Sequence, residues 1–303
     1  MRIAVAGSTG LIGSALGEAL RARGDEVLRL VRPDTGAEGI FWDPARGSLE
    51  PGALDGVDAV INLAGRSIGE RRWSDREKTA LLSSRVDSSR LLGEAVVGDG
   101  VPVLLNASAI GFYGDRGDEP VTETAARGTG FLAELTAEWE AATGPAAAAG
   151  VRVALLRTGM VLTRRGGALA KMLAPFGPSW LSPFKWGWGG RLGSGRQVWS
   201  WISLEDQVRA VLHVLDGGLD GPVNLTGPAP ATNREFTRAL SRLLRRPAVI
   251  PIPAFALEIL LGSELAQGLL LDGARVVPER LTRSGFEFAH PDLDAALAAA
   301  FAV

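Results

Sequence analysis

Ile3-Ala4-Val5-Ala6-Gly7-Ser8-Thr9-Gly10-Leu11-Ile12-Gly13 is the stretch of sequence that decides the fold. Its apolar start predicts a strand, and helical periodicity over residues 11–23 predicts a helix directly after the glycines. The three glycines allow a tight turn, remove a Cβ where the backbone must approach a pyrophosphate, and let the helix pack closely on the sheet. We therefore expect residues 7–13 to bind phosphates at the free amides of the helix.

Short apolar runs alternate with amphipathic stretches through the first two thirds of the chain. This alternation is typical of repeated strand-helix-strand units and predicts an α/β fold with a doubly wound parallel sheet. The expected strands are Ile3–Ala6, Glu26–Val31, Ala59–Leu63, Pro102–Ala107 and Val151–Leu156.

Three helix starts carry recognisable capping residues. Ser74 with Glu77 forms a capping box that opens a helix predicted to reach about Val97, and Thr232 with Glu235 repeats the pattern. Ser203, followed by two carboxylates, opens another helix, because its side chain and their charges satisfy the first-turn amides.

The end of the second predicted strand indicates which dinucleotide fits the glycine loop. An acidic residue about 20 positions on would bind the ribose hydroxyls of NAD, whereas an arginine accepts the 2′-phosphate of NADP. Here Arg32 lies 19 residues after Gly13. Because a guanidinium gives bidentate contacts to phosphate, the sequence favours NADP(H). Asp34 is close enough to leave NAD(H) as the alternative.

Composition excludes several classes of protein and site. The chain has 303 residues, and its 32 Lys and Arg against 34 Asp and Glu give a net charge of −2, without the basic excess that nucleic-acid binding needs. It has no cysteine and two histidines, which excludes disulfides, thiolate metal sites and multi-histidine metal sites. With no export signal and no long apolar segment, we expect a soluble cytoplasmic protein with a small-molecule substrate and no membrane or nucleic-acid partner.

Further motifs resemble the extended branch of the short-chain dehydrogenase/reductase superfamily. More narrowly, they resemble an atypical, nucleoside-diphosphate-sugar epimerase-like group with a Rossmann-type domain followed by a short C-terminal domain of unknown function. The resemblance spans nearly the whole chain. Its motifs are Asp58-Ala59-Val60-Ile61-Asn62-Leu63-Ala64-Gly65, Ser84-Arg85-Val86, Asn106-Ala107-Ser108-Ala109, Tyr113-Gly114-Asp115, Arg157-Thr158-Gly159-Met160-Val161-Leu162, Gly190-Arg191-Leu192-Gly193-Ser194-Gly195-Arg196-Gln197, Trp201-Ile202 with Asp206, and Pro278-Glu279-Arg280-Leu281 through Gly285-Phe286 to Pro291-Asp292-Leu293.

The resemblance implies a cofactor site and a domain division. Besides the loop and Arg32, the residues implied to line the cofactor are Leu63, Ala64, Gly65, Arg85, Ala107 and Thr158. We expect a Rossmann-type domain over residues 1–226, with 166–195 making an excursion into the substrate lobe, and a small, mainly helical C-terminal domain over 227–303. From their own setting in the sequence, Trp186 and Trp188 are the expected substrate-binding residues. Lys171 is a further candidate, for an anionic substrate, and a plain surface lysine is the favoured alternative.

The acid-base pair of the superfamily is missing. The usual mechanism uses a tyrosine with a lysine four residues on, but the only tyrosine, Tyr113, is followed at that distance by Gly117. Counting from Ser108 puts the pair at Phe131 and Leu135, and aligning on Glu140 puts it at Leu132 and Thr136. Ordinary Tyr-Lys chemistry is therefore excluded in either register.

Ser108 and Tyr113 remain the candidate catalytic residues. Ser108 is a candidate anchor for a substrate hydroxyl or oxyanion, with a structural role as the alternative, and a pocket wall or loop anchor is favoured for Tyr113. Glu134, Glu138 and Glu140 follow on a predicted helix, where we expect a solvated face.

The leading hypothesis is an NADP(H)-dependent oxidoreductase or epimerase-like enzyme whose proton comes from water, the substrate or an unusual side chain. The missing pair motivates a rival, a non-catalytic redox sensor or regulatory protein that binds NADP(H). A scaffold that binds no nucleotide is a third reading. The substrate, the reaction and the oligomeric state are left open.

Overall fold

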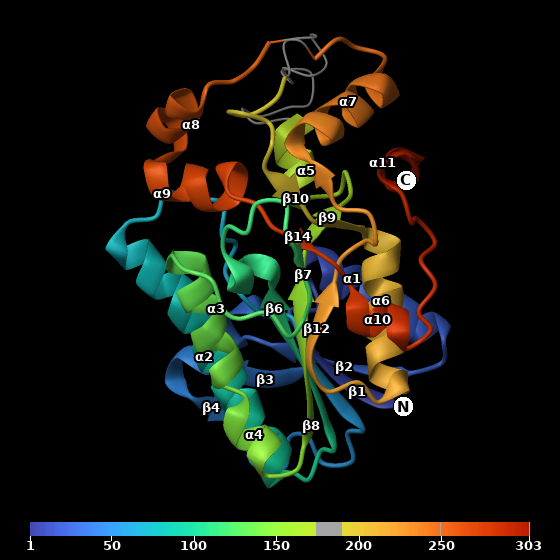
Figure 1. Cartoon of the computed structure of the whole chain (residues 1–303). Coiled ribbons are helices and arrows are strands. Elements are labelled where there is room, and N and C mark those ends of the chain that lie inside the picture. The colour runs from blue at the N-terminus through green and yellow to red at the C-terminus, as the bar shows by residue number, and fades with distance from the viewer. Residues whose placement is uncertain (174–189, 249, 303) are drawn as a thin grey trace.

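The computed structural model describes residues 1–173, 190–248 and 250–302, and their central feature is a twisted, mostly parallel sheet (Figure 1). Its strand order is β12-β8-β6-β5-β1-β2-β3-β4, and only the β3–β4 pair is antiparallel. The strands are β1 (Arg2–Ala6), β2 (Glu26–Val31), β3 (Ile40–Asp43), β4 (Ser48–Leu49), β5 (Ala59–Asn62), β6 (Val103–Ala109), β8 (Arg152–Thr158) and β12 (Gly221–Leu225). The predicted doubly wound fold is confirmed.

Helices cover both faces of this sheet, and Figure 1 shows them to the left and to the right of the strands. On one face, α1 (Leu11–Ala22) packs beside α6 (Leu204–Gly217). The other face is covered by α2 (Asp75–Gly98), α3 (Phe131–Ala141) and α4 (Gly144–Ala148). Each side therefore has its own apolar core against the central strands, with Leu16 and Val211 in one core and Leu92 and Ala146 in the other.

Individual hydrogen bonds confirm the three predicted N-cap residues, but the capping box predicted for Ser74 and Glu77 is only half formed. Ser74 and Ser203 accept bonds from the amides three residues on, at the starts of α2 and α6, and α2 ends one residue after the predicted end. Thr232 and Glu235 form a complete capping box at the start of α7 (Asn233–Leu244). Glu77 does not complete its own box, because its carboxylate binds Arg66 instead.

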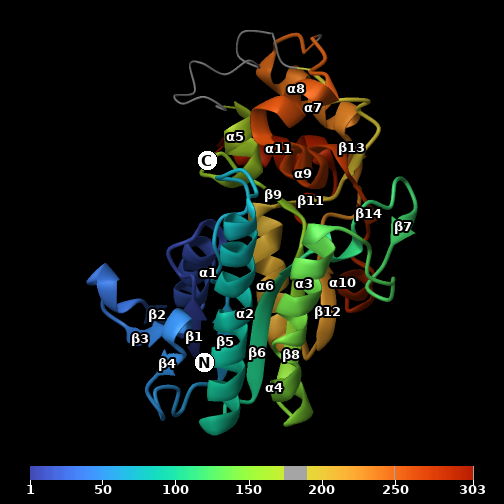
Figure 2. The ribbon, with the colours of Figure 1, turned by 90° about the vertical axis from the view of Figure 1, so that its left-hand side faces the viewer.

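A second lobe sits above the carboxyl ends of the strands (Figures 1 and 2). Its core contains Leu169, Trp199, Trp201, Phe236 and Leu297. Its helices are α5 (Gly167–Leu173), α7, α8 (Ala254–Leu261), α9 (Ser263–Ala266), η5 (Gln267–Leu271) and α11 (Leu293–Ala302).

The remaining elements are short. The strands are β7 (Pro120–Val121), β9 (Met160–Leu162), β10 (Val198–Trp199), β11 (Trp201–Ser203), β13 (Ala231–Thr232) and β14 (Arg275–Val276). The helical turns are η1 (Pro33–Thr35), η2 (Pro44–Arg46), η3 (Ile110–Tyr113) and α10 (Glu279–Arg283). Among the described residues, no helix is both long and apolar enough to cross a membrane.

Candidate functional site

The glycine loop is built by close backbone approaches at the carboxyl end of β1. Gly7 has a left-handed φ of 74°, and a Cβ there would lie 2.6 Å from the carbonyl oxygen of Leu63. A Cβ on Gly13 would lie 2.1 Å from the carbonyl oxygen of Gly7. These two glycines therefore seat the start of α1 against the ends of β1 and β5, and Leu63 and Ala64 lie beside the loop.

Gly10 differs from these two glycines. It is the N-cap of α1, its φ of −74° suits any residue, and a Cβ there would meet only the carbonyl oxygen of Gly7, at 3.2 Å. No side chain caps the helix, so its first-turn amides at residues 11–13 lack intrahelical acceptors. The start of α1 therefore combines a residue without a side chain and free backbone donors, which is the arrangement that binds phosphates.

Two arginines on and after β2 flank the loop. Arg32 is exposed directly after the strand, where the sequence predicts a contact with the adenosine phosphate. Arg29 is half-buried, and its Nε donates to the Ser8 hydroxyl at 3.2 Å. Sequence reasoning missed Arg29. The signal in the sequence was a cationic residue within a mainly apolar strand, three residues before Arg32.

Hydrogen bonds between asparagine and serine side chains tie the strand ends beside the loop. Asn62 Nδ2 donates to Asn106 Oδ1 at 2.8 Å, and the Ser89 hydroxyl donates to the same oxygen at 2.9 Å. The amide of Ala64 donates to Asn62 Oδ1 at 3.1 Å, which fixes the turn after β5. All three polar side chains are buried and paired, so they hold β5, β6 and α2 in register.

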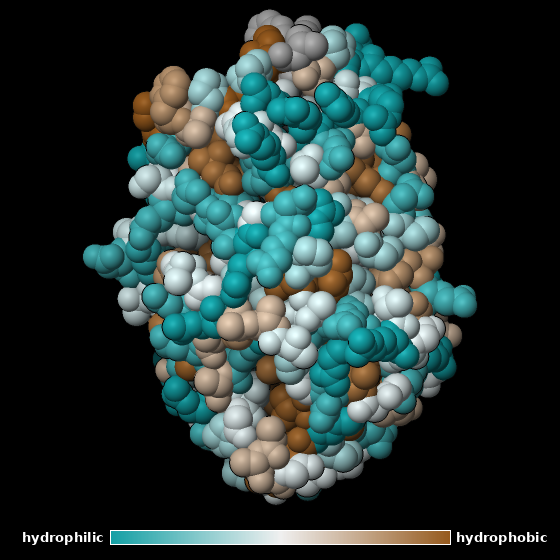
Figure 3. All heavy atoms as spheres, viewed as in Figure 1, coloured by the Kyte–Doolittle hydropathy of each residue, from teal (hydrophilic) through white to brown (hydrophobic). Residues whose placement is uncertain are grey.

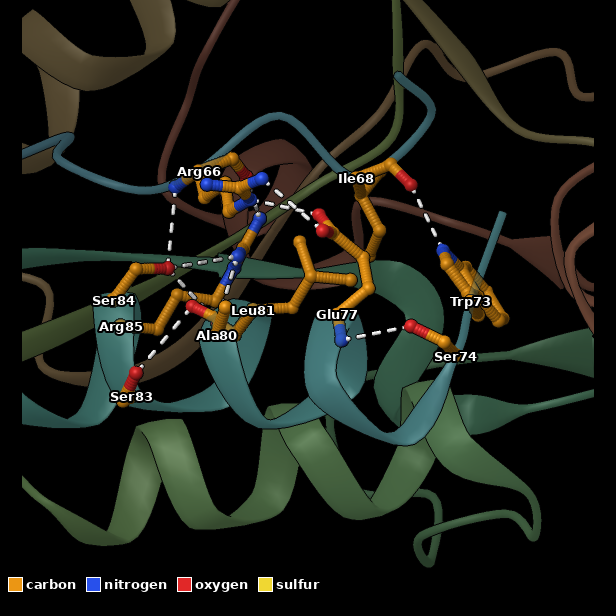
Figure 4. Close-up of polar contacts among 10 residues, drawn as sticks. All are labelled: Arg66, Ile68, Trp73, Ser74, Glu77, Ala80, Leu81, Ser83, Ser84 and Arg85. Atoms are coloured by element: carbon orange, nitrogen blue, oxygen red, sulfur yellow. Dashed lines mark hydrogen bonds and ion pairs between the residues drawn. The ribbon is translucent and has the colours of Figure 1, made fainter. Parts of the chain in front are cut away.

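The loop after β5 carries an ion pair at its surface (Figure 4). Arg66 Nε and Nη2 lie 2.7 and 3.1 Å from the two carboxylate oxygens of Glu77, on the first turn of α2. The hydrogen bond from Arg66 lowers the pKa of Glu77, and Glu77 in turn raises the pKa of Arg66. This pair orients residues 64–66 over α2.

Arg85 lies beneath that loop, and Figure 4 shows it reaching from α2 toward Arg66. Its Nη2 donates to the carbonyl oxygen of Arg66 at 2.8 Å, and its guanidinium stacks on the Trp139 ring at 5.2 Å. A Cβ on Gly65 would touch it at 3.6 Å. Burial lowers the pKa of Arg85 to about 10, so it stays cationic at neutral pH. The predicted cofactor residues Gly65 and Arg85 are therefore neighbours.

A buried ionic network occupies the far end of the same sheet edge. Arg157, on β8, binds both carboxylate oxygens of Glu140, at 2.8 and 2.7 Å, and the Ser108 hydroxyl donates to Glu140 Oε1 at 2.5 Å. All three side chains are 9% exposed or less. The prediction of a solvated face is therefore wrong for Glu140, which shares the buried face of α3 with Ala133 and Thr136, while Glu134 and Glu138 are exposed.

Tyr113 belongs to this network. Its hydroxyl donates to Asn224 Oδ1 at 2.7 Å and accepts from Arg157 Nη1 at 2.9 Å, and the residue has no exposed surface. Burial raises the pKa of Tyr113 above its ordinary value, against the opposing effect of the Arg157 charge. This geometry fits a loop anchor, the reading that the sequence favours, and does not support Tyr113 as a proton donor to a substrate.

The positions where the superfamily carries its Tyr-Lys pair are packed by apolar atoms. In the register set by Glu140 they are Leu132 and Thr136, and the Thr136 hydroxyl bonds to the carbonyl oxygen of Leu132 at 2.7 Å. A Cβ on Gly268, in η5, would lie 3.3 Å from the Trp73 ring and 3.4 Å from Leu132. The C-terminal segment therefore covers this part of α3.

The remaining predicted residues lie around this edge. Ala107 packs with Leu81 and Trp139, and the Thr158 hydroxyl accepts from Gln207 Nε2 at 3.3 Å. Lys171 is exposed, and its Nζ donates to the carbonyl oxygen of Gly69 at 2.9 Å, which joins α5 to the loop after β5. Trp186 and Trp188 lie outside the described residues. The part of the chain that the structure describes holds no cluster of His, Asp or Glu suited to a metal ion.

Two family models together match most of the chain. Residues 3–226 match the NAD dependent epimerase/dehydratase family, and residues 252–300 match a domain of unknown function. An epimerase family protein of Mycobacterium bovis is 48% identical over 297 residues, covering 97% of this chain and 96% of that protein.

Solved structures support the same assignment. The crystal structure of the human epimerase family protein SDR39U1 (isoform 2) with NADPH has a TM-score of 0.87 and 32% identity, and the match covers all of both chains. The Thermus thermophilus UDP-glucose 4-epimerase in complex with NAD has a TM-score of 0.73 over 98% of this chain and 96% of that one, and at 21% identity it shows the fold alone. The chain is therefore a member of the NAD-dependent epimerase/dehydratase family.

Proposed function

We propose that the protein binds NADP(H) with its diphosphate on residues 7–13 and its nicotinamide half over residues 63–65 and Arg85. The observation that carries this proposal is Gly10, whose backbone conformation does not require glycine and where an added Cβ would crowd only one atom of the chain, the carbonyl oxygen of Gly7 at 3.2 Å. A pyrophosphate that approaches the uncapped start of α1 does require it. The NADPH in the human relative supports the same choice.

Arg29 and Arg32 are the proposed determinants of NADP(H) over NAD(H). Arg29 is held beside the loop through Ser8, and Arg32 is exposed at the end of β2. Two guanidinium groups at this edge match the charge and geometry of a 2′-phosphate, which NAD(H) lacks.

Titration of the protein with NADPH and NADH tests this assignment. A charged hydrogen bond contributes about 1.5–3 kcal/mol, so Arg29→Ala and Arg32→Ala should each weaken NADPH binding by about tenfold to a hundredfold. NADH affinity should stay unchanged, as should both affinities in Arg283→Ala, an exposed arginine on α10. Equal losses for both dinucleotides would overturn the role of the two arginines.

We further propose hydride transfer between NADP(H) and a small carbonyl compound or nucleotide sugar, bound between the carboxyl edge of the sheet and the second lobe. When bound, the nicotinamide supplies or accepts the hydride. The Ser108 hydroxyl donates its hydrogen bond to Glu140, and the Tyr113 hydroxyl donates its hydrogen bond to Asn224. We therefore propose that water or the substrate supplies the proton that accompanies hydride transfer. Stopped-flow mixing with NADPH and a carbonyl panel tests this, and a panel without turnover would count against it.

The second candidate is a non-catalytic sensor of NADP(H). It is favoured by the packing of η5 over Leu132, because this contact links the proposed nicotinamide end to the C-terminal domain. A redox-dependent change there would alter the outer surface of that domain. Affinity capture from lysate with NADP⁺ or NADPH present checks this, and the same partners in both states would argue against sensing.

A further inference from the structure

A cavity of about 290 Å³ lies in the second lobe, away from the glycine loop. Its lining comes from α7, from the turn before β10 and from the segment before α8. The described lining residues are Arg191, Arg234, Thr237, Arg238, Ala248 and Pro251. Figure 3 shows hydrophilic surface on the α7 side of this lobe and apolar surface over α8.

The charge of this lining is one-sided. Three of the six residues are arginines, no described lining residue is acidic, and within the described ranges none of the three forms an ion pair. Arg234 and Arg238 are four residues apart on α7, a spacing at which like charges destabilise a helix. Arg242, one turn further along α7, instead binds both oxygens of Asp294 at 2.8 Å. The helix therefore neutralises one of its arginines and gathers two at the cavity.

The backbone around Gly195 brings the arginines together. Gly195 has a left-handed φ of 69°, and a Cβ there would lie 3.1 Å from the Cβ of Arg191 and 3.5 Å from that of Arg234. Arg191 Nη1 donates to the carbonyl oxygens of Gly193 and Ser194 at 2.8 and 2.9 Å, and the amide of Arg234 donates to Gly195 at 3.0 Å. These bonds hold one amino group of the Arg191 guanidinium on the turn at residues 193–194 and hold that turn against the start of α7.

Thr237 completes the lining between Arg234 and Arg238. It is 4% exposed, and among the described residues its hydroxyl has no hydrogen-bond partner. A buried hydroxyl without a partner destabilises the fold, and a ligand oxygen that reached it on binding would relieve this cost. Guanidinium groups and a hydroxyl are the donors that bind phosphate oxygens.

We propose that this cavity binds a small phosphorylated anion, of the size of a diphosphate or a sugar phosphate, at a site separate from the dinucleotide loop. Its volume is at the lower end of ligand pockets, roughly 300–1,000 Å³, which suits such an anion and is too small for a whole dinucleotide. Arg191, Arg234 and Arg238 contact the phosphate oxygens, and Thr237 accompanies them at the cavity wall.

Isothermal titration calorimetry with pyrophosphate tests the site, with inorganic phosphate, glucose 1-phosphate and glucose as further arms. The titrations are run with and without saturating NADPH, because the glycine loop itself binds diphosphate. We expect the phosphorylated compounds to bind, glucose to give no heat, and the affinity for pyrophosphate to persist under NADPH and fall with added salt. No binding of any phosphorylated compound up to 10 mM, or complete displacement by NADPH, would overturn the site.

Matched variants locate the binding. Arg234→Gln and Arg238→Gln should each weaken pyrophosphate binding at least tenfold, while Arg242→Gln on the same helix should leave it unchanged. Thr237→Val removes only the hydroxyl, and it should weaken binding without lowering the melting temperature. Equal losses in Arg242→Gln and Arg238→Gln would show that α7 attracts anions by charge alone and would contradict the proposal.

Discussion

Two regions of the sheet's carboxyl edge differ in where their polar groups point: the carboxyl end of β1, called here the outward-facing end, and those of β6 and β8, called here the inward-facing end. At β1 the amides that start α1 and the exposed Arg32 face outward, and Gly10 leaves space that the chain does not use. At β6 and β8 the polar side chains turn inward, where Ser108, Glu140 and Arg157 satisfy one another. The difference teaches that the loop at β1 leaves backbone donors free for a ligand, whereas the polar side chains at β6 and β8 are used by the fold itself.

The inward-facing end gives the largest expected effect. Glu140→Ala would leave the Arg157 charge buried without its partner, and losing one member of a buried pair costs about 3–5 kcal/mol. Urea unfolding should show that loss in the free energy of unfolding, or no folded protein at all. The control is Glu138→Ala, on an exposed face of α3, where a change within about 0.5 kcal/mol is expected. Similar values for the two variants would contradict the structural role of Glu140.

At the outward-facing end, we expect a substitution to change NADPH binding more than stability. Gly10→Val adds atoms at the N-cap of α1, where a Cβ would lie 3.2 Å from the carbonyl oxygen of Gly7, so the fold should survive with a modest loss of stability, but the proposed pyrophosphate position is blocked. We expect NADPH affinity to fall at least tenfold, about 1.4 kcal/mol, with a small fall in melting temperature. Gly13→Ala is the contrasting variant, because its Cβ would clash with backbone and should lower the melting temperature as well. Intact NADPH binding in Gly10→Val would contradict the proposed site.

The outward-facing end could be predicted because its signals are local. The strand, turn and helix of residues 3–23 are contiguous in sequence, and Gly10 and Gly13 make their close approaches within that unit. The central strands and the capping residues Ser74, Ser203 and Thr232 were predicted for the same reason. Short or irregular elements such as β3, β4 and η5 carry too few residues to show a period.

The inward-facing end could not be predicted as a network, because its partners come from distant parts of the chain. Glu140 meets Arg157 from a neighbouring strand, and Tyr113 meets Asn224, 111 residues later. One signal was present: Arg157 ends the apolar run of β8, and a charge in a buried strand requires a partner. Because Ala133, Thr136 and Glu140 are spaced to share one face of a helix, the sequence could have indicated Glu140 as that partner.

The smallest expected effect concerns the Tyr113 hydroxyl, which we expect to keep its proton to a higher pH in the folded protein than in the unfolded chain. Because Tyr113 is the chain's single tyrosine, tyrosinate absorbance near 295 nm reports on this hydroxyl alone. Burial raises the pKa of Tyr113 in the folded state, so the folded protein should show less tyrosinate than the urea-unfolded chain at a pH near 10, where the unfolded chain titrates. The neutral hydroxyl then stabilises the fold fully below about pH 10, and that contribution is lost as the pH rises through the folded-state pKa. Tyr113→Phe, which has no tyrosine, gives the background absorbance to be subtracted. If folded and unfolded protein titrated at the same pH, the hydroxyl would be open to solvent, and the contrast between the two ends of the sheet edge would fail at its most informative residue.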